Sequence, residues 1–360
     1  MARLNSKKIF VINKYGNSTG GGMVIQNFFV ETIQLADPES STELVNLKSP
    51  LNTFLFILKR NIDFLFKSKR DLLVFQGVYS LHFILFDLFL LKRIKSIIMP
   101  RGDYIPHKDD IWAVPSRFRK ILYWNVFIKR RILRANKLVF SSELELKRYR
   151  RMNVVLENIH IIPDSINLQT RFGIKNNNVW ESKNSKLIMY VGRISPEKNI
   201  EFLLDVLFKL HQTDDKLKNY KLLIVGPVSK SKYSEFLMYK IEKMNLIENV
   251  IFKYSTNSTE LSQLYQNCSV VLLPSHIESF GLTVLESLYF GKNIIVSDCT
   301  PWKGWNMELL HVCKLESNIW VDKILSLDLS SFNEEKSIQF LNMFSLENVS
   351  KKWEQLLNEI

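Results

Sequence analysis

The stretch Lys186–Asn199 reads KLIMYVGRISPEKN and contains the pattern from which the architecture follows. A short apolar run ends at Gly192, where a polar loop begins and leads into an amphipathic segment. This order is typical of a buried parallel strand followed by a helix. The same alternation recurs along both halves of the chain, and it predicts an α/β protein built of two doubly wound domains.

The expected strands are short apolar runs, and each is followed by a helical pattern. In the first half they are Lys8–Ile12, Glu43–Leu47, Leu72–Gln76, Ser96–Met99, Lys137–Ser141 and Ile159–Pro163, and in the second half Lys186–Val191, Lys221–Val225, Val250–Phe252, Val270–Leu273 and Ile294–Val296. Strands and helices that alternate in this way form parallel sheets with helices on both faces.

The boundary between the domains is marked by a polar segment. The residues between Arg171 and Lys186 are rich in Asn, Lys and Ser and have no apolar periodicity, which is typical of an exposed linker. We predict a first domain at residues 1–172, a linker at 173–185 and a second domain at 186–344. Residues 345–360 have apolar side chains at helical spacing, and we expect this last helix to pack on the first domain.

Length and composition exclude several classes of protein. A chain of 360 residues is longer than one hydrophobic core usually supports, and its 46% hydrophobic and 24% charged residues argue against disorder. The three cysteines, Cys268, Cys299 and Cys313, are too few for a disulfide framework or a structural zinc site. There is no apolar leader after Met1 and no apolar run of the roughly 18 residues that a spanning helix needs, so we expect a cytoplasmic protein.

The positive charge of the chain lies in its first half. Residues 1–180 contain 29 Lys and Arg against 14 Asp and Glu, and the remaining residues contain 20 against 22, which divides the net charge of +13 into +15 and −2. Two segments rich in cations and aromatic residues, Ser116–Arg134 and Phe54–Arg70, contribute to this excess. We interpret them as contacts with an anionic membrane surface, in preference to solvated helix faces or to nucleic acid, for which no recognised module is present.

The loop after the first strand of the second domain brings two cations together. Gly192 allows a tight turn, Arg193 and Lys198 follow it, and a helix is expected to begin near Asn199. Ligands of parallel α/β domains bind at the carboxyl ends of the strands, where helix N-termini attract anions. A planar guanidinium and a compact ammonium at this place suit a diphosphate, although the same two residues also fit ordinary surface cations.

A second loop carries two acidic residues with seven residues between them. It follows the run Val270–Leu273 and reads PSHIESFGLTVLE, with Glu278 in the loop and Glu286 in the helix that begins near Gly281. Because a helix rises about 1.5 Å per residue, the two carboxylates are too far apart to share a proton. They suit hydrogen bonds to hydroxyl groups at two places on one extended ligand.

Together these residues resemble the donor half of family-four retaining glycosyltransferases, whose GT-B fold has two Rossmann-like domains facing each other across a cleft. The resemblance is strong over residues 185–300 and weak over the rest of the chain. It implies that Arg193 and Lys198 bind the diphosphate of a nucleotide-sugar. It also implies that Glu278 contacts the donor sugar and Glu286 holds the ribose hydroxyls. The other implied donor-binding residues are Gly192, Ser279, Phe280, Gly281 and Leu282.

The first half contains fewer candidate residues. The glycine-rich segment Gly16–Gly22 resembles the loop that lines the cleft in this family, which makes Gly20 and Gly21 donor-binding candidates; a flexible turn is the alternative. After the expected strand Ser96–Met99, an Arg-Gly-Asp run stands where many relatives carry a histidine. Its residues Arg101 and Asp103, with His107 nearby, are the acceptor-side candidates.

The resemblance implies transfer of a hexose or N-acetylhexosamine from a UDP- or GDP-sugar, with retention of anomeric configuration. The expected acceptor is a lipid-linked saccharide at the inner face of the cell membrane, in O-antigen or capsule synthesis. We expect no metal, since the chain has no Asp-x-Asp motif. We also expect no cofactor and no nucleic-acid partner. Two alternatives stay open: a nucleotide-sugar epimerase of similar fold, and a non-enzymatic polyanion-binding protein.

Overall fold

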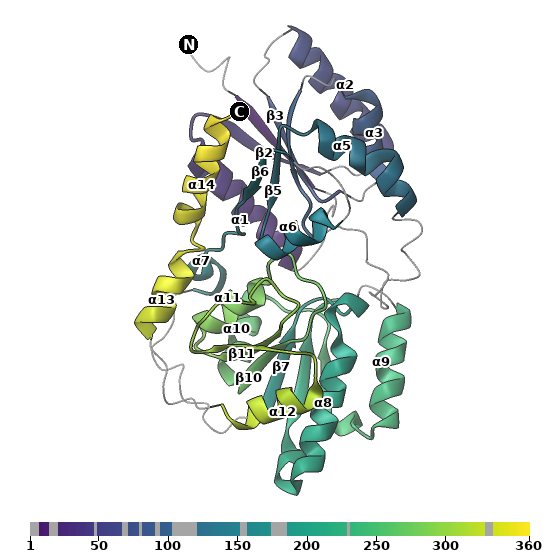
Figure 1. Ribbon diagram of the computed structural model, residues 1–360, viewed down its shortest axis with the longest axis vertical. Coiled ribbons are helices and arrows are strands. Elements are labelled where there is room, and N and C mark those ends of the chain that lie inside the picture. Colours follow the sequence, from purple (N-terminus) through teal and green to yellow (C-terminus); the bar gives the residue numbers. More distant parts are fainter. Residues whose placement is uncertain are drawn as a thin grey trace. The chain divides into compact units, whose positions relative to one another are not determined.

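The chain forms two compact α/β units, which are described separately (Figure 1). The computed structural model describes residues 7–13, 21–46, 49–66, 71–78, 81–90, 94–102, 121–151, 157–173, 186–228, 231–327 and 334–360. Unit 1 comprises Met1–Ile166 and Phe344–Ile360, and unit 2 comprises Asn167–Met343. Within the described residues each unit contains one parallel six-stranded sheet, which confirms the predicted α/β class.

The sheet of unit 1 has the strand order β2-β1-β3-β4-β5-β6. Its strands are β1 (Lys8–Asn13), β2 (Ser41–Asn46), β3 (Leu72–Gln76), β4 (Lys95–Met99), β5 (Lys137–Phe140) and β6 (Ile159–Ile161). All neighbouring strands run parallel. Every residue of β3 is buried, because a parallel sheet is covered on both faces and its central strands are apolar throughout.

Helices cover the two faces of this sheet. They are α1 (Gly21–Ala36), α2 (Pro50–Phe66), α3 (Leu81–Phe89), the π-helix η2 (Trp124–Ile128), α5 (Lys129–Arg134) and α6 (Glu143–Arg150). The ring centroid of Phe10 in β1 lies 5.6 Å from that of Phe56 in α2, and the centroid of Phe75 in β3 lies 5.4 Å from that of Phe83 in α3. These contacts place α2 and α3 on the same face of the sheet.

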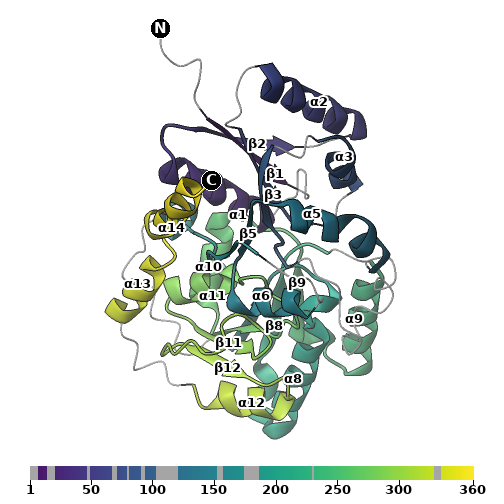
Figure 2. The ribbon, with the colours of Figure 1, turned by 45° about the horizontal axis from the view of Figure 1, so that its top comes forward.

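The opposite face of the sheet is covered by α1 and by the last helix, α14 (Leu346–Asn358). Figures 1 and 2 both show α14 alongside α1. The Trp353 ring packs edge-on against Phe29 of α1, with ring centroids 5.2 Å apart. Val349, Leu356 and Leu357 join the same core cluster. The end of the chain therefore completes the hydrophobic core of unit 1.

The sheet of unit 2 has the strand order β12-β11-β10-β7-β8-β9, and its pairs are also parallel. Its strands are β7 (Leu187–Val191), β8 (Lys221–Val225), β9 (Val250–Lys253), β10 (Val270–Leu273), β11 (Asn293–Ser297) and β12 (Leu310–Cys313). The edge strand β12 is not among the strands expected from the sequence.

The helices of unit 2 alternate with its strands. They are α7 (Leu168–Phe172), η3 (Pro196–Lys198), α8 (Ile200–Thr213), η4 (Asp215–Asn219), α9 (Ser231–Lys243), η5 (Ile247–Asn249), α10 (Ser258–Asn267), α11 (Leu282–Tyr289), α12 (Ser317–Leu325) and α13 (Glu334–Asn342). In the part of the chain that the structure describes, no helix in either unit has the length and apolar character needed to cross a membrane.

The chain passes from unit 1 to unit 2 earlier than the sequence indicated. We expected the first domain to extend to residue 172, but α7 belongs to unit 2. The Phe172 ring packs against Phe290 and Tyr265, with ring centroids 5.0 and 6.2 Å apart, which attaches α7 to unit 2. Residues 174–185 of the expected linker lie outside the described residues.

His311 of β12 is expected to make unit 2 less stable in acid. Its Nε2 lies 2.8 Å from Asn293 Oδ1, and burial lowers the pKa of the imidazole from 6.5 to about 4. As the pH falls, the unfolded chain binds this proton first, so the contribution of His311 is complete above about pH 6.5 and is lost between about pH 6.5 and 4.

Denaturant unfolding of the wild type and His311→Gln over this pH range tests the expectation. The free energy of unfolding of the variant is expected to fall less steeply than that of the wild type as the pH decreases. Equal slopes for the two proteins would mean that His311 does not control the acid sensitivity.

Candidate functional site

The candidate site lies where the strand order of unit 2 reverses. From β7 the chain moves to β8 and β9 on one side, and it then returns to β10 on the other side of β7. The loops after β7 and β10 therefore leave neighbouring strands and turn in opposite directions. In parallel α/β sheets, ligands bind in the crevice at such a reversal.

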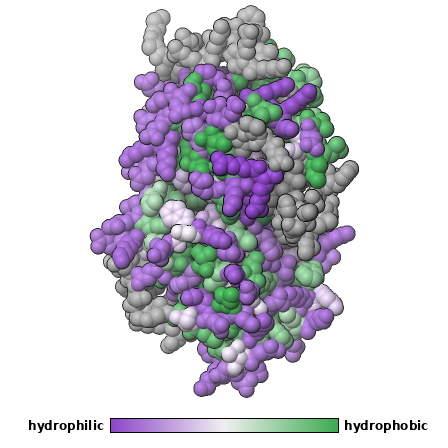
Figure 3. All heavy atoms as spheres, viewed as in Figure 1, coloured by the Kyte–Doolittle hydropathy of each residue, from purple (hydrophilic) through white to green (hydrophobic). Residues whose placement is uncertain are grey.

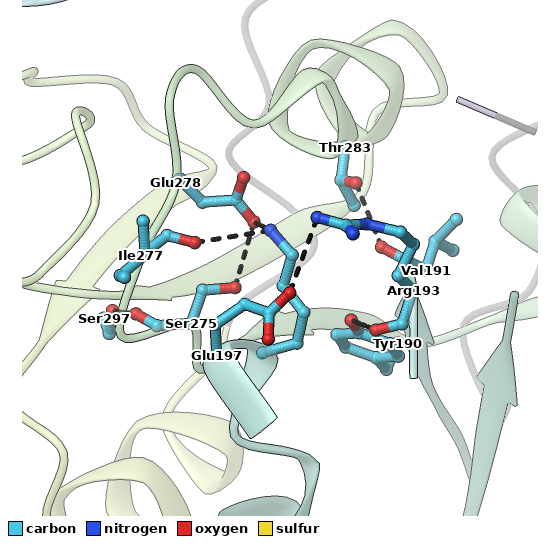
Figure 4. A network of polar contacts seen from close by, with 10 residues as sticks. Tyr190, Val191, Arg193, Glu197, Ser275, Ile277, Glu278, Thr283 and Ser297 are labelled. Carbon is cyan, nitrogen blue, oxygen red and sulfur yellow. Dashed lines mark hydrogen bonds and ion pairs between the residues drawn. The ribbon is translucent and has the colours of Figure 1, made fainter. Parts of the chain in front are cut away.

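Hydrogen bonds join these two loops directly. The His276 N–H donates to the Glu197 carbonyl oxygen over 3.0 Å. The Thr283 hydroxyl at the start of α11 donates to the Val191 carbonyl at the end of β7 over 3.1 Å (Figure 4). The two segments that the sequence singled out are thus adjacent in the structure.

Lys198 and Glu278 form the centre of this polar network. Lys198 Nζ lies 2.6 Å from Glu278 Oε1 and also donates to the Ile277 carbonyl oxygen over 3.3 Å. The Ser275 hydroxyl donates to Glu278 Oε1 over 3.0 Å, and Ser297 donates to the Ser275 carbonyl over 2.5 Å (Figure 4). A series of hydrogen bonds from β11 through the loop after β10 therefore holds the Glu278 carboxylate against the Lys198 ammonium.

Glycine is required where the β7 loop passes the end of β8. A Cβ on Gly226 would lie 2.0 Å from the Gly192 carbonyl oxygen, and a Cβ on Gly192 would lie 2.6 Å from the Tyr190 hydroxyl. That hydroxyl donates to the Arg193 carbonyl over 2.8 Å. Burial and the charge of Glu278 raise the pKa of Tyr190 well above its ordinary value, so the phenol keeps its proton. The backbone at Arg193 is held in place by this hydrogen bond.

Arg193 is the more exposed of the two cations. Its side chain is 52% exposed, and Nη2 lies 3.5 Å from Glu197 Oε1. Burial raises the pKa of Glu197, but its own backbone N–H, the Arg193 guanidinium and Ser195 together outweigh burial and leave the pKa below its ordinary value. Glu197 is therefore ionised and holds the Arg193 guanidinium near the loop. About half of the Arg193 side chain stays accessible to a ligand.

The two helix N-termini of the site differ. The first N–H of α8, from Ile200, donates to the Tyr233 hydroxyl over 2.9 Å, so this helix end is already occupied in part by a side chain. At α11, Gly281 has a φ of +89°, in the left-handed region that favours glycine. The Phe280 side chain is buried against Trp302, with ring centroids 5.1 Å apart, so it anchors the turn. The Phe280 ring is thus turned away from a ligand, whereas the backbone of the turn Ser279–Leu282 is a candidate for contact with a donor.

Glu286 lies in a second, separate set of contacts. Its Oε1 is 2.9 Å from Arg171 Nε, and its Oε2 accepts a hydrogen bond from the Tyr265 hydroxyl over 2.7 Å. The Arg171 and Glu286 side chains are only 10% and 4% exposed. Burial and the adjacent carboxylate raise the pKa of Tyr265 well above its ordinary value, which keeps the phenol a donor. Glu278 and Glu286 thus have different partners, as expected for carboxylates that do not share a proton.

Sequence reasoning missed Arg171 and Tyr265. Arg171 is 115 positions before Glu286 and lies in a segment that we assigned to the first domain. Tyr265 lies in α10, where its aromatic side chain fits an ordinary core position. No local pattern identifies either as a partner of Glu286, because the contacts depend on how α7, α10 and α11 pack together.

The first-half candidates are mostly buried or undescribed. The Arg101 guanidinium forms an ion pair with Asp164, and both side chains are buried. It also lies over the Phe29 ring, 5.6 Å from the centroid. The structure therefore places the Arg101 side chain, an acceptor-side candidate, in the interior of unit 1. Asp103, His107 and Gly20 lie outside the described residues, and Gly21 is the first residue of α1.

The described residues also bear on whether the chain could bind a metal ion. Within residues that the structure describes, no group of three or more His, Cys, Asp or Glu side chains is arranged to hold a metal ion. The β7 and β10 loops present a half-exposed guanidinium, a largely buried ammonium–carboxylate pair and backbone N–H groups. These groups can bind a diphosphate next to a hydroxyl-bearing ligand.

Comparisons with known proteins agree with this chemistry. Residues 174–303 match the family described as glycosyl transferases group 1. An uncharacterized glycosyltransferase of Methanocaldococcus jannaschii is 31% identical over 159 residues, which cover 44% of this chain and 35% of the relative. A 41.2 kDa protein in the cps region of Klebsiella pneumoniae is 26% identical over 258 residues, which cover 70% of this chain and 66% of the relative. The chain spans less than two thirds of the length of both relatives.

The fold as a whole is similar to that of solved glycosyltransferase structures. The crystal structure of Anabaena HepE in complex with UDP and glucose has a TM-score of 0.71, covers 98% of this chain and 100% of that one, and is 13% identical. At this identity the likeness shows the fold alone. The chain thus has the two-domain α/β fold of GT-B glycosyltransferases, and the match of residues 174–303 to glycosyl transferases group 1 supports a glycosyltransferase.

Proposed function

We propose that the chain is a retaining glycosyltransferase that transfers a hexose or N-acetylhexosamine from a nucleotide-sugar to a lipid-linked saccharide. The observation that carries this proposal is the Lys198–Glu278 pair, with Nζ and Oε1 2.6 Å apart at the reversal point of the unit 2 sheet. The pair lies inside the segment matched to glycosyl transferases group 1. The UDP and glucose in the HepE structure support a nucleotide-sugar as the donor.

Each group at the site has a proposed task. Lys198, Arg193 and the N–H groups at the start of α11 stabilise the charge that develops on the departing diphosphate. Glu278 accepts hydrogen bonds from the donor sugar, and Glu286 accepts them from the ribose. The bond between the anomeric carbon and the diphosphate oxygen breaks as the acceptor oxygen bonds to the same face of that carbon. The proton of the acceptor hydroxyl passes to the diphosphate, so no protein base is required.

The acceptor is proposed to be carried by a lipid at the inner face of the cell membrane. The first 180 residues have a net charge of +15, which favours an anionic surface as a partner. The relative in the cps region of Klebsiella pneumoniae supports a place in the synthesis of a surface polysaccharide. We therefore propose O-antigen or capsule synthesis as the process.

A ligand screen followed by a transfer assay tests this function. A nucleotide-sugar that binds the native state raises the melting temperature, so UDP- and GDP-sugars are screened first by thermal shift. The best donor is then incubated with glycan–lipid acceptors, and the anomeric configuration of the product is determined by NMR. Donor turnover without an acceptor would indicate an epimerase. Binding to nucleic acid that persists at high salt, with no response to any nucleotide-sugar, would indicate a polyanion-binding protein.

Arg193→Ala is expected to lower kcat about 10²-fold with little change in the melting temperature. The guanidinium is half exposed and its contact with Glu197 is long, so its removal costs little stability. Lys218→Ala is the matched control, because Lys218 is also exposed, lies in the same unit and pairs with Asp215. Steady-state kinetics of both variants separate the site from a general effect of lost charge. Equal activity of the two variants would show that Arg193 has no role in catalysis.

A further inference from the structure

The outer side of α2 carries a row of exposed apolar side chains. Its members, Leu51, Phe54, Leu55, Leu58 and Ile62, are between 38% and 66% exposed, and we call them the α2 stripe. Their spacing of mostly three or four positions places them on one face of the helix. The opposite face, with Thr53, Ile57 and Arg60, is buried against unit 1. A helix whose outer side contacts only water usually has polar residues there. The outer side of α2 instead carries apolar side chains.

The adjacent helix α3 extends this apolar surface. The rings of Phe54 and Phe89 pack edge-on with centroids 5.4 Å apart, and the Asn61 side chain donates to the Phe89 carbonyl over 2.8 Å. Leu88 and Phe89 are themselves exposed. Apolar side chains gather in Figure 3 over the place where Figure 1 shows α2 and α3. The stripe is therefore part of a surface shared by two helices, of the kind that marks an interaction site.

Cations border this apolar surface. Lys59 on α2 and Lys129, Arg130 and Arg134 on α5 are exposed. Residues 121–134 contain no acidic residue. Arg131 is buried between them, donates to the Val78 carbonyl over 3.1 Å and lies over the Phe83 ring, which attaches α5 to the start of α3. The three helices lie side by side in both ribbon views (Figures 1 and 2).

Asp63, the acidic residue of α2, does not cancel the charge of these cations. Asp63 lies 2.6 Å from the buried Arg60, which also pairs with Asp71 at 3.1 Å, so both carboxylates are held at Arg60 beneath the stripe. The single negative charge in excess there is smaller than the charge of the four exposed cations. A second copy of the chain that used the same surface would bring its own cations against Lys59 and the α5 cations. An anionic partner with an apolar interior has the complementary character.

We propose that α2, α3 and α5 form the surface by which the chain binds an anionic lipid bilayer. The α2 stripe with Leu88 and Phe89 enters the boundary between headgroups and acyl chains, and the exposed cations bind headgroup phosphates. This deepens the proposed function by naming the surface that meets the membrane of the lipid-linked acceptor. Of the cations in the two segments that the sequence analysis interpreted as a membrane contact, Arg60 and Arg131 are buried and do not belong to this surface.

Sedimentation with vesicles tests the proposal without any glycosyl transfer. The wild type is expected to bind vesicles of equal parts phosphatidylglycerol and phosphatidylcholine, and to bind phosphatidylcholine alone much more weakly. Leu55→Ser/Leu58→Ser is expected to weaken binding at least about tenfold. Lys129→Ala and Arg130→Ala are each expected to weaken it about fivefold. Because part of the contact is apolar, measurable vesicle binding is expected to persist at about 0.5 M salt.

A matched control and a size measurement complete the design. Phe236→Ser/Tyr239→Ser removes two exposed apolar side chains from α9 of unit 2 and is expected to leave vesicle binding unchanged. The α2 variant is expected to keep the donor response of the wild type, so loss of vesicle binding and loss of donor binding are distinguishable. Equal vesicle binding by the α2 variant and the wild type would overturn the proposal. So would a wild-type dimer without vesicle binding that the α2 variant converts into a monomer.

Discussion

Lys198→Ala is expected to lower kcat about 10³-fold, the largest loss of activity among the substitutions considered. The Lys198 side chain is 12% exposed, so its charge acts on a bound diphosphate with little screening by water. Loss of one group that stabilises the transition-state charge costs about 10²–10³-fold in kcat. Removal of the ammonium also takes its partner from Glu278, so the upper end of that range is expected. Lys198→Arg keeps the charge but changes its shape, and an intermediate rate is expected.

Lys240→Ala is the control for a general effect of losing a lysine ion pair. Lys240 Nζ lies 2.7 Å from Asp205 Oδ1 and donates to the Glu201 carbonyl over 3.0 Å, between α8 and α9 and outside the two site loops. Both variants are measured by steady-state kinetics at saturating donor and by thermal denaturation. The control is expected to keep its kcat. A Lys198→Ala variant that stays within a few-fold of the control would show that the site is wrongly assigned.

Arg171→Met is expected to lower the free energy of unfolding by about 3–5 kcal/mol, because it leaves the Glu286 carboxylate buried without its counter-charge. The two side chains are 10% and 4% exposed, and the ion-pair distance is 2.9 Å. Glu286→Gln is expected to destabilise for the converse reason. In the double variant Arg171→Met/Glu286→Gln no unpaired charge remains, and the Gln oxygen can still accept from Tyr265. Most of the stability is therefore expected to return, as denaturant unfolding would measure.

The same variants separate a structural role of Glu286 from a role in donor binding. Arg171→Met retains the carboxylate, so below its melting temperature it is expected to bind the donor nucleotide about as well as the wild type. The double variant regains stability but lacks the carboxylate, and its affinity is expected to fall about tenfold, since a hydrogen bond to a charged group is lost. Titration with the 2′-deoxy nucleotide is the control, because it should bind both proteins alike. Wild-type affinity in the double variant would leave Glu286 a structural role only.

Local patterns were sufficient for most of the strands. The expected runs Leu72–Gln76, Lys221–Val225 and Val270–Leu273 coincide with β3, β8 and β10. Buried strands of parallel sheets are continuous apolar runs, so their bounds are visible in the residue types. The edge strand Leu310–Cys313 was not predicted, because it is short and includes a histidine. Its pairing with β11 is what makes it a strand.

The two loops of the candidate site were proposed from the sequence, but the contacts between their residues could not be predicted. Gly192, Arg193, Lys198 and Glu278 stood out because strand-end loops of α/β domains bind ligands and these residue types suit a diphosphate and hydroxyl groups. Lys198 and Glu278 are 80 positions apart, and their contact depends on β7 and β10 being neighbours. The ion pair of Arg101 with Asp164 was not predicted either, because the two residues are 63 positions apart and meet only in the folded unit.

Residue types and their periodicity were therefore enough to predict the α/β class and the two-domain organisation, and to propose the loops of the candidate site. These properties depend on neighbours in the chain, whose preferences are local. Packing in three dimensions assigned α7 to unit 2, paired Arg171 with Glu286, buried Arg131 and turned the apolar row of α2 outward. Such contacts follow from strand order and helix packing, which bring together residues that the chain itself keeps far apart.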